Sequence, residues 1–575
     1  MNDAHLYFEF EDDNGKKQPM QFTRPSGVIT AYSGEEVKAA FRKIERELSI
    51  GNYVAGYVSY EAAPAFDGAS RVKSGTKWPL LWFGVFKSPL CEELVHENKP
   101  YQVSEWNMDG DFDNYSDGLR KIKAAIKKGD TYQVNYTTRL NASFHGDDFA
   151  FYKQLVNNQR SRYSAYMNMG EGRRVLSASP ELFFRKQEAK LKTKPMKGTA
   201  RRGVTLETDR EQVRTLKESE KERAENLMIV DLLRNDLGKL AVSGTVRTSS
   251  LFEVETYPTV HQMTSTIEAE VNRELSFYEI FRALFPCGSI TGAPKIRTMD
   301  YIADLEASPR EIYCGAIGYI TPSRDAVFNV PIRTVMLDEN QAVYGTGGGV
   351  TWDSTPIGEY EEMQTKAQLL TEKRPEFKLL ESLKLENGRI PLLENHLNRL
   401  EDSASYFNFI FDKNEVITQL NDLVSKHNDG EYKVRLLLSE HGVAELEAIE
   451  INEEINEVTC CLAEEPVDER NPFLYHKTTH RSVYDIHKRE GAFAALLWNT
   501  REELTEFTMA NLVVKHQGDF FTPPVQSGLL AGTFREELLK NDRVKEKVLH
   551  VKELSSFEEV WMVNGVRGWV KVQLL

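Results

Sequence analysis

Alternation of apolar and polar residues along the first two thirds of the chain predicts many short strands among a few helices. The run at 51–60 alternates small and aromatic residues, as a sheet strand does. Apolar residues at helical spacing predict helices at 34–48 and 115–128, and a β-rich run follows at 131–137. Strands and helices continue without an internal repeat to about residue 372. This pattern predicts an α+β or α/β sandwich.

The pattern starts again after a short charged segment at 372–376. A strand, a turn, a strand and a helix are expected there, and the Asn-Gly pair at 387–388 between apolar runs is a strong β-hairpin signal. At 575 residues the chain is also long for one domain. We therefore predict two functional parts, residues 1–372 and 373–575.

Composition excludes several classes of protein. The net charge of −15 argues against a nucleic-acid binder and against a protein that binds an anionic membrane. No apolar run approaches the roughly 20 residues of a membrane span, and the N-terminus lacks the basic and apolar segments of a signal peptide. The five cysteines show no CxxC spacing, which favours reduced thiols over disulfides or a zinc site. We predict a cytoplasmic protein.

Lys197 is the first candidate catalytic residue. It lies between a proline and a Gly-Thr pair, at a predicted turn beside strand-like runs at 182–185 and 190–192. A lysine held against apolar walls can lose its proton and become a nucleophile. A single loop lysine is more often only a solvated charge, so this hypothesis depends on other residues.

Four glutamates occur as two i, i+3 pairs on helices predicted at 207–228 and 358–372. Each pair lies on one helical face, where like charges repel and favour a cation or a basic partner. Either pair alone is better explained as a solvated helix face. Together they fit a Mg²⁺ site, because Mg²⁺ takes one or two protein carboxylates with substrate oxygens and water. The residues are Glu222, Glu225, Glu359 and Glu362.

Two glycine-rich segments, at 288–295 and 345–349, are candidate anion-binding loops. Neither has the spacing of a P-loop, but exposed backbone N–H groups can bind a carboxylate as readily as a phosphate. Arg333, in a strand predicted at 330–334, could clamp a carboxylate with two hydrogen bonds. Considered by itself, Arg333 is more simply explained as part of a structural ion pair.

Taken together, these segments resemble the chorismate-utilising enzymes, the family of anthranilate synthase, aminodeoxychorismate synthase, isochorismate synthase and salicylate synthase. The resemblance covers about 115–372, with its motifs in the order of the family. The motifs are SPE at 179–181, PMKGT at 195–199, AENLMIVDLLRND at 224–236, His261, GSITGAPK at 288–295, YCGA at 313–316, IRT at 332–334, GGG at 347–349 and EYEE at 359–362.

Two positions bear on which reaction the resemblance implies. Members that add water have a lysine base where this chain has Gln133, so ammonia is the expected nucleophile. The second position is Lys197, in the motif PMKGT. Anthranilate synthases resemble one another in having Pro-Ile-Ala-Gly-Thr there, whereas a lysine is typical of aminodeoxychorismate synthase component I. The resemblance implies that Lys197 attacks C2 of chorismate while Glu181 protonates the departing C4 hydroxyl. Ammonia then enters at C4 and gives 4-amino-4-deoxychorismate.

The resemblance also implies the ligands of this site. Mg²⁺ would be held by Glu225 and Glu362, with Glu222 and Glu359 behind them. No cysteine lies in a Gly-x-Cys-x-Gly nucleophile setting, so ammonia is expected from a separate glutamine amidotransferase subunit or from solution. The expected substrate-binding residues are Gly198, Thr199, His261, Thr291, Tyr313, Arg333, Gly347, Gly348, Gly349 and Lys366.

Residues 371–575 resemble the fold-type IV pyridoxal-phosphate enzymes, which include branched-chain aminotransferases and aminodeoxychorismate lyase. The matching segments are HKTTHR at 476–481, TEFTMAN at 505–511 and LLAGTFR at 529–535. The resemblance implies the Schiff-base lysine, a glutamate at the pyridine nitrogen, and phosphate binding by an arginine and a Gly-Thr turn that opens a helix. The implied cofactor-binding residues are Lys477, Glu506, Arg399, Asn511, Gly532 and Thr533.

These motifs leave lyase and aminotransferase open for the C-terminal part. The fusion favours the lyase, because the product of the first part is its substrate, and the two steps would then make 4-aminobenzoate for folate. An anthranilate synthase component I joined to a branched-chain-type aminotransferase is the alternative within enzymes. A half that only scaffolds the amidotransferase is the alternative outside them. Fold-type IV enzymes are usually dimers, so a homodimer through the second part is possible.

Overall fold

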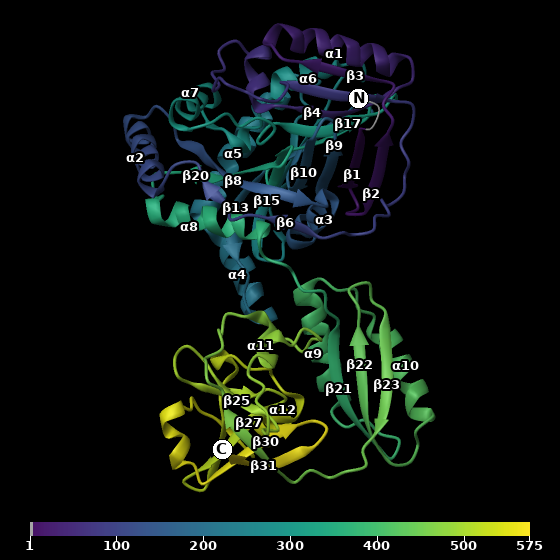
Figure 1. Ribbon diagram of the computed structural model, residues 1–575, viewed down its shortest axis with the longest axis vertical. Coiled ribbons are helices and arrows are strands. Elements are labelled where there is room, and N and C mark those ends of the chain that lie inside the picture. The colour runs from purple at the N-terminus through teal and green to yellow at the C-terminus, as the bar shows by residue number, and fades with distance from the viewer. Residues whose placement is uncertain (1–3) are drawn as a thin grey trace. The chain divides into compact units, whose positions relative to one another are not determined.

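The computed structural model describes residues 4–575, which divide into two compact units (Figure 1). The first comprises Met1–Arg201 and Val213–Arg374, and the second comprises Arg202–Gln212 and Pro375–Leu575. Each unit is described by itself. The predicted division after residue 372 separates two activities, whereas the two units are defined by contacts between residues. The division by activity therefore stays a prediction.

The first unit is built on two ten-stranded sheets. The first sheet has the order β16 (Gly292–Ala293), β8 (Gln133–Gly146), β20 (Gln341–Val350), β19 (Thr334–Asp338), β10 (Arg173–Ser179), β9 (Tyr163–Asn168), β1 (His5–Glu11) and β2 (Lys17–Thr23), with β6 (Tyr101–Val103) and β7 (Asn107–Met108) paired to β8. The second has the order β13 (Met196–Arg201), β15 (Val260–Glu270), β12 (Lys190–Lys194), β11 (Leu182–Gln187), β18 (Ala326–Asn329), β17 (Ala316–Ile320), β4 (Tyr53–Val58), β5 (Leu81–Phe86) and β3 (Gly27–Ala31), with β14 (Arg247–Thr256) paired to β15.

Aromatic side chains fill the space between the two sheets. Phe8 of the first sheet meets Tyr319 of the second with ring centroids 5.5 Å apart, and Phe22 meets Phe86 at 5.2 Å. Period-two alternation along each strand puts these rings on one face, and their burial drives the sheets together. The α+β sandwich predicted from the sequence is confirmed. Its helices are α1 (Gly34–Ser49), α2 (Phe112–Lys128), α3 (Asp148–Gln159), α5 (Glu220–Gly238), α6 (Phe277–Leu284), α7 (Lys295–Leu305) and α8 (Pro356–Ala367).

A buried ionic network fastens the glycine-rich segment at 288–295 to β8. Arg310 forms a 2.6 Å ion pair with Glu306, which also accepts hydrogen bonds from the backbone and hydroxyl of Thr137 on β8. The Arg310 guanidinium donates to the carbonyls of Ile290 and Asn135. Because all these groups are removed from water, each needs its partner to remain satisfied.

The second unit has a small sheet and a barrel. The small sheet, β21 (Leu379–Glu386), β22 (Glu431–Leu438) and β23 (Ala444–Glu450), packs one face against α9 (Leu393–Phe407) and α10 (Lys413–Ser425). The barrel closes because β26 pairs with both β25 and β27. Its order is β26 (Leu504–Phe507), β25 (Ala495–Trp498), β24 (Glu457–Leu462), β31 (Gly568–Leu574), β30 (Glu559–Asn564) and β27 (Ala510–His516), extended by β28 (Asp519–Thr522) and β29 (Lys545–Glu546), with helices α11 (Ser482–Asp485) and α12 (Thr533–Lys540).

The segment Arg202–Gln212, which the sequence does not mark as part of the second unit, packs into it. The Arg202 guanidinium stacks 4.3 Å from the ring centroid of Tyr406 and donates to the Tyr406 carbonyl at 2.7 Å. The Tyr406 hydroxyl returns a hydrogen bond to the Gly203 carbonyl at 2.8 Å. Stacking and paired hydrogen bonds thus fix this segment on α9.

Two predicted helices have different bounds in the structure. The helix predicted at 207–228 is two helices, α4 (Leu206–Glu218) and α5, which meet at Ser219. Ser219 leaves the helical conformation and its hydroxyl accepts the N–H of Glu222 at 3.3 Å, because a serine is a favourable N-cap. The helix predicted at 358–372 is α8 followed by a short 3₁₀ turn at Gln368–Leu370.

The hairpin predicted at 387–388 closes only one antiparallel bridge, between Glu386 and Arg389. Asn387 and Gly388 do form a turn with positive φ of 47° and 73°, but α9 follows and β21 pairs instead with the distant β22. Pro391 has no N–H to donate to a ladder, which explains why no second strand begins there. Arg333 likewise lies outside a strand, with φ of 54° immediately before β19.

Replacing Arg310 by Met should destabilise the first unit by about 3–5 kcal/mol, because the substitution leaves Glu306 charged, buried and without its main partner. Differential scanning calorimetry of the first unit's transition measures this. The control Arg71→Met removes an ion pair with Asp304 whose side chains are 57% and 53% exposed, and should change stability by less than about 1 kcal/mol. Equal effects of the two substitutions would contradict the structural role of the buried network.

Candidate active sites

A cavity of about 240 Å³ in the first unit gathers most of the residues predicted for the first site. Its lining draws on both sheets and on α5 and α8. His261 and Thr291 are exceptions: both are buried but do not line it, and Thr291 instead bonds to the carbonyls of Cys287 and Gly288. The predicted residues that do line it are Glu181, Lys197, Gly198, Thr199, Glu222, Glu225, Tyr313, Arg333, Gly347, Gly348, Gly349, Glu359, Glu362 and Lys366.

Lys197 lies in strand β13 and not at the turn that the sequence predicts. The register against β15 shifts between Met196 and Thr199, and Gly198 has φ of 97°, so the strand bulges at Lys197. Asn226 of α5 donates to the Lys197 carbonyl at 3.1 Å, and Gln262 of β15 donates to the Gly198 carbonyl at 2.9 Å. Side chains from a helix and a neighbouring strand therefore fix the bulge. The sequence analysis did not single out Asn226 or Gln262.

Glycines of β20 make room for the polar groups of this site. A Cβ at Gly349 would lie 2.2 Å from Nε2 of Gln133 and 3.2 Å from Nζ of Lys197. A Cβ at Gly348 would lie 2.8 Å from Oε2 of Glu359 and 3.6 Å from Oε1 of Glu362. The glycine run thus serves close approach of side chains to the strand backbone.

Lys197 and Glu181 influence each other's protonation inside the cavity. Burial lowers the pKa of the Lys197 amine, although the nearby Glu181 opposes this effect and Lys366 adds to it. Burial raises the pKa of Glu181 to about 7, against smaller opposing effects of Ser289 and Lys197. Oε1 of Glu181 is buried without a hydrogen-bond partner. This arrangement places an amine whose neutral form is favoured by burial beside a carboxyl group whose pKa of about 7 lets it donate a proton.

The four glutamates come from α5 and α8 and line the same cavity. Burial and the neighbouring Glu222 raise the pKa of Glu225, and Oε2 of Glu359 is buried without a partner. Glu362 is paired with Lys366 at 2.6 Å. Among residues 4–575 no group of three or more His, Cys, Asp or Glu is arranged to hold a metal by itself. A cation bound here would take one or two of these carboxylates and complete its shell with substrate oxygens and water, as Mg²⁺ does.

Arg333 and Lys366 contribute positive charge to the lining. The Arg333 guanidinium donates to the Lys366 carbonyl at 2.6 Å, and Lys366 donates to the Gly347 carbonyl at 2.7 Å. These bonds hold the arginine to the end of α8 and the lysine to β20. Both cations are thereby held in the lining of the cavity, where Lys366 also pairs with Glu362.

A second cavity, of about 510 Å³, contains all the residues predicted for a cofactor in the second unit. Burial lowers the pKa of Lys477 to about 8, with Arg399 the next cause. The amine therefore loses its proton far more readily than an exposed lysine. These residues are Arg399, Lys477, Glu506, Asn511, Gly532 and Thr533.

Glu381 of β21 holds the side chain of Arg399, and the sequence analysis did not single it out. The two pair through two hydrogen bonds of 2.8 and 2.7 Å, while Nδ1 of His396 lies 2.7 Å from the same carboxylate. Nε2 of His396 lies 3.2 Å from the hydroxyl of Thr533, at the start of α12. Arg399 and the N-terminus of α12 are thus joined through one buried chain of polar contacts, and both attract an anion.

Glu506 is held by residues around its carboxylate. It accepts hydrogen bonds from the hydroxyl of Tyr484 at 2.9 Å, from Nδ2 of Asn511 at 3.1 Å and from the backbone of Leu530 at 3.2 Å. Burial nevertheless raises the pKa of Glu506 to about 7. A cationic ring nitrogen facing this carboxylate would satisfy the charge that burial disfavours.

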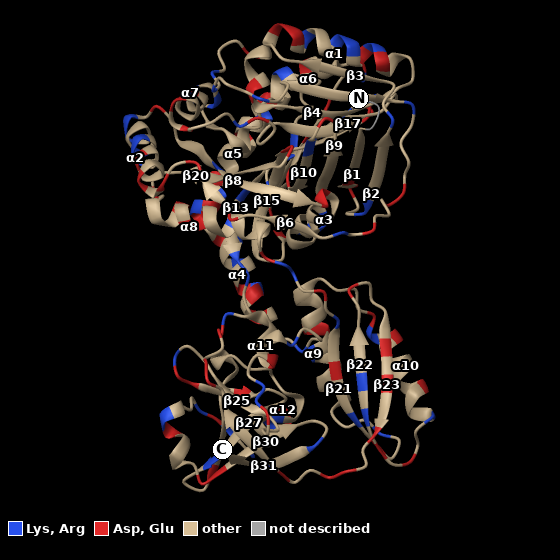
Figure 2. Cartoon of the chain, viewed as in Figure 1, with Lys and Arg blue, Asp and Glu red and all other residues tan. Residues whose placement is uncertain are grey.

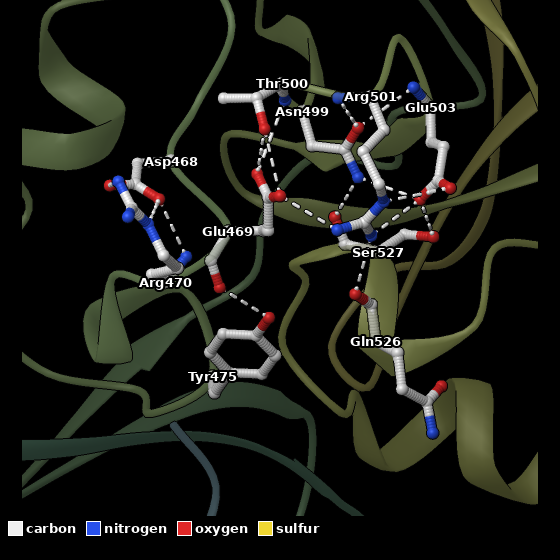
Figure 3. A network of polar contacts seen from close by, with 10 residues as sticks. All are labelled: Asp468, Glu469, Arg470, Tyr475, Asn499, Thr500, Arg501, Glu503, Gln526 and Ser527. Carbon is white, nitrogen blue, oxygen red and sulfur yellow. Dashed lines mark hydrogen bonds and ion pairs between the residues drawn. The ribbon is translucent and has the colours of Figure 1, made fainter. Parts of the chain in front are cut away.

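The chain leading to Lys477 is fixed by a network around Arg501 (Figure 3). Arg501 binds Glu469 at 2.8 Å and Glu503 at 2.9 Å, and the Tyr475 hydroxyl donates to the Glu469 carbonyl at 2.7 Å. Tyr475 precedes Lys477 by two residues. The network therefore ties the lysine's own segment to the loop after β25.

Two family models match separate parts of the chain. The model of the chorismate binding enzyme family matches residues 92–372, and that of amino-transferase class IV matches residues 378–575. Aminodeoxychorismate synthase component 1 of Salmonella typhimurium (strain LT2) is 40% identical over 274 residues, 48% of this chain and 60% of that protein. Aminodeoxychorismate synthase of Streptomyces griseus is 43% identical over 258 residues, 45% of this chain and 36% of that protein.

A solved structure shares the fold of the first unit. Anthranilate synthase component I from Streptococcus pneumoniae TIGR4 has a TM-score of 0.55 at 23% identity, covering 61% of this chain and 91% of that one.

The chain therefore joins two domains: residues 92–372 match the chorismate binding enzyme family and residues 378–575 match the class IV aminotransferase family. The first is a domain of the kind found in aminodeoxychorismate synthase component I. Class IV aminotransferase domains depend on pyridoxal phosphate, and chorismate-binding enzymes typically use Mg²⁺. Both resemblances expected from the sequence are confirmed.

The residues of the second cavity fit pyridoxal phosphate. A Cβ at Gly532 would lie 1.8 Å from Oδ1 of Asn511, so only glycine allows the chain to approach there. Arg399 and the N-terminus of α12 would hold the phosphate, and Glu506 would face the ring nitrogen.

Two further findings concern the class of protein. Over the part of the chain that the structure describes, no helix is both long and apolar enough to cross a membrane. All five cysteines are free thiols, four of them buried.

Replacing Gly532 by Ala should weaken cofactor binding about ten- to a hundredfold, because the new methyl group displaces Asn511 and with it one hydrogen bond to the Glu506 carboxylate. Titration of the apoprotein with pyridoxal phosphate, followed by its visible absorbance, measures the affinity. The control Gly68→Ala has no atom within 4 Å of the added Cβ and should bind the cofactor as the wild type does. Unchanged affinity of the Gly532 variant would contradict the role of this close approach.

Proposed function

We propose that the chain makes 4-aminobenzoate from chorismate and ammonia in two steps, one in each domain. The observation that carries the proposal is the cavity in which the Lys197 amine, with a lowered pKa, accompanies the protonatable Glu181. Identity of 40% to a component 1 of aminodeoxychorismate synthase supports the first step. The residues of the class IV domain support the second.

In the first step neutral Lys197 forms a bond to C2 of chorismate, both ring double bonds shift by one position, and the C4 hydroxyl leaves as water with a proton from Glu181. Ammonia then bonds to C4, and the lysine leaves from C2. The net change is chorismate plus ammonia to 4-amino-4-deoxychorismate plus water. Bound Mg²⁺ would neutralise a substrate carboxylate, and Tyr313, Arg333 and Lys366 would hold other polar groups of the substrate.

Ammonia is the proposed nucleophile because Gln133, which lines the cavity, cannot act as a base toward water. A Cβ at Gly349 would lie 2.2 Å from Nε2 of Gln133 and 3.2 Å from Nζ of Lys197, so both side chains reach the same glycine. Oε1 of Gln133 is buried without a hydrogen-bond partner. We propose that a separate glutamine amidotransferase supplies the ammonia, in keeping with the name component 1 of the relatives.

In the second step Lys477 removes the proton from C4 of 4-amino-4-deoxychorismate, and the C3–O bond breaks to release pyruvate. Pyridoxal phosphate, when bound, supplies the electron-accepting ring that stabilises the negative charge developing at C4. Glu506 keeps the ring nitrogen protonated, and Arg399 orients the phosphate. Loss of the side chain aromatises the six-membered ring and gives 4-aminobenzoate.

Product analysis tests both steps. Purified protein with chorismate, Mg²⁺, ammonium chloride and pyridoxal phosphate should release 4-aminobenzoate and pyruvate. Lys197→Ala should make neither product from chorismate but should still convert supplied 4-amino-4-deoxychorismate, because its second site is intact. Lys477→Ala should accumulate 4-amino-4-deoxychorismate.

The control variant Lys121→Ala changes an exposed lysine of α2 and should behave as the wild type. Anthranilate as the product would overturn the assignment of the first step. Transfer of the amino group to a keto acid, without release of pyruvate, would overturn the second.

The rate of the first step should depend on pH as a bell-shaped curve. As pH rises above about 7, Glu181 loses the proton that it must donate, so the rate falls; at low pH Lys197 is protonated and cannot attack, so the rate falls again. Glu181→Gln should lower kcat about 10²–10⁴-fold and remove the alkaline limb. Initial rates against pH, at constant free ammonia, measure both effects. An alkaline limb that persists in Glu181→Gln would assign it to another group.

A further inference from the structure

Two cations of the second cavity are not among the residues predicted to bind the cofactor. Lys433 and Arg567 both line the cavity that contains Lys477 and Glu506. Lys433 belongs to β22 of the small sheet, and Arg567 belongs to the turn between β30 and β31 of the barrel. The two sheets of the second unit therefore each supply one cation to the same cavity.

Strand alternation explains the orientation of Lys433. Its neighbours Val434 and Leu436 are buried in the core beneath α9 and α10, so Lys433 lies on the other face of the small sheet. Leu380 and Ser382 of the adjacent β21 share that face and also line the cavity. Positive positions on β22 are visible in Figure 2.

Neither cation is neutralised by the protein. Among the described residues, no carboxylate lies within ion-pair distance of Lys433 or Arg567, although Arg567 stacks 5.5 Å from the ring centroid of Phe493. Burial lowers the pKa of Lys433, and the charges of Arg567 and Arg435 lower it further. Glu453 also lines the cavity but is not among the charges that act on Lys433. Both residues are exposed and line the cavity, so their positive charge is available to an anionic ligand.

This pair is separate from the reacting amine. The backbone N–H of Leu380 donates to the Lys477 carbonyl at 2.9 Å, and Leu380 pairs with Leu437 of β22. Lys433 lies four residues away along β22, roughly 13 Å at about 3.3 Å per residue. An anion bound by the pair would thus lie away from the atom at which chemistry occurs. A substrate that fits has its amine at Lys477 and a carboxylate remote from that amine.

We propose that Lys433 and Arg567 bind the substrate carboxylate that lies across the ring from the reacting amine, and so select a cyclic aminocarboxylate. The proposal rests on the function proposed above and deepens it. In 4-amino-4-deoxychorismate the C1 carboxylate is opposite the C4 amine. The amine end of the substrate would lie at Lys477, and the carboxylate would lie at Lys433 and Arg567. An α-amino acid carries its carboxylate on the carbon next to the amine and offers no such second group.

The test uses the full chain loaded with pyridoxal phosphate and two probes, 4-aminobenzoate and its methyl ester, which differ in the carboxylate charge. Binding is followed through the cofactor's visible absorbance. The wild type should bind the acid at least about tenfold more tightly than the ester, and the double variant Lys433→Ala/Arg567→Ala should bind both alike. The conservative variant Lys433→Arg should keep the preference.

The control Lys426→Ala removes an exposed lysine after α10 and should also keep the preference. In steady-state assays with 4-amino-4-deoxychorismate, the double variant should raise KM about tenfold or more, with a smaller change in kcat. A merely structural role would move cofactor binding or kcat and leave the acid-to-ester ratio unchanged.

A preference that survives in the double variant would overturn the proposal, as would a wild type that binds the two probes equally or binds neither at millimolar concentration. Turnover of 4-amino-4-deoxychorismate by the wild type reports the lyase function separately. Turnover without discrimination between the probes contradicts the carboxylate site alone. Discrimination without turnover contradicts the lyase function alone.

Discussion

Burial of a lysine amine governs both sites of this protein. A charged ammonium loses hydration when it is enclosed, so burial shifts the equilibrium toward the neutral amine that can react. In the first unit burial lowers the pKa of Lys197, and the nearby Glu181 partly opposes this shift. In the second unit burial lowers the pKa of Lys477 to about 8. The same loss of hydration raises the pKa of Glu181 and of Glu506 to about 7. Each cavity thus pairs an accessible neutral amine with a carboxyl group of altered protonation.

Such burial is tolerated because hydrogen bonds hold the surrounding backbone in place. In the first unit the bulge of β13 is fixed by Asn226 and Gln262, and glycines of β20 allow side chains to approach closely. The network of Arg310 and Glu306 ties the loop that carries Ser289 to β8. Pre-arranged groups need no costly reorganisation when charge develops in a transition state.

The second unit uses a different framework for a similar purpose. A closed barrel and a small sheet enclose the cavity, and Glu381 fixes Arg399 while Tyr484 and Asn511 fix Glu506. The polar residues around the cofactor site are nearly all paired within the protein. Lys433 and Arg567 differ, because within residues 4–575 no carboxylate forms an ion pair with either of them. This contrast separates residues that hold a cofactor from residues available to a substrate.

The sequence alone determined the α+β class, the two families and the candidate residues, because those depend on local alternation and on motifs of fixed spacing. Sequence reasoning failed for features that depend on contacts between residues far apart in the chain, such as strand pairing. Asn387 and Gly388 form the expected turn, yet β21 pairs with β22 more than forty residues later, and Ser219 splits a helix that periodicity alone would continue. Asn226, Gln262 and Glu381 act through hydrogen bonds to residues far along the chain. Only the tertiary structure decides such contacts, because packing of whole sheets, and not local preference, sets which side chains meet.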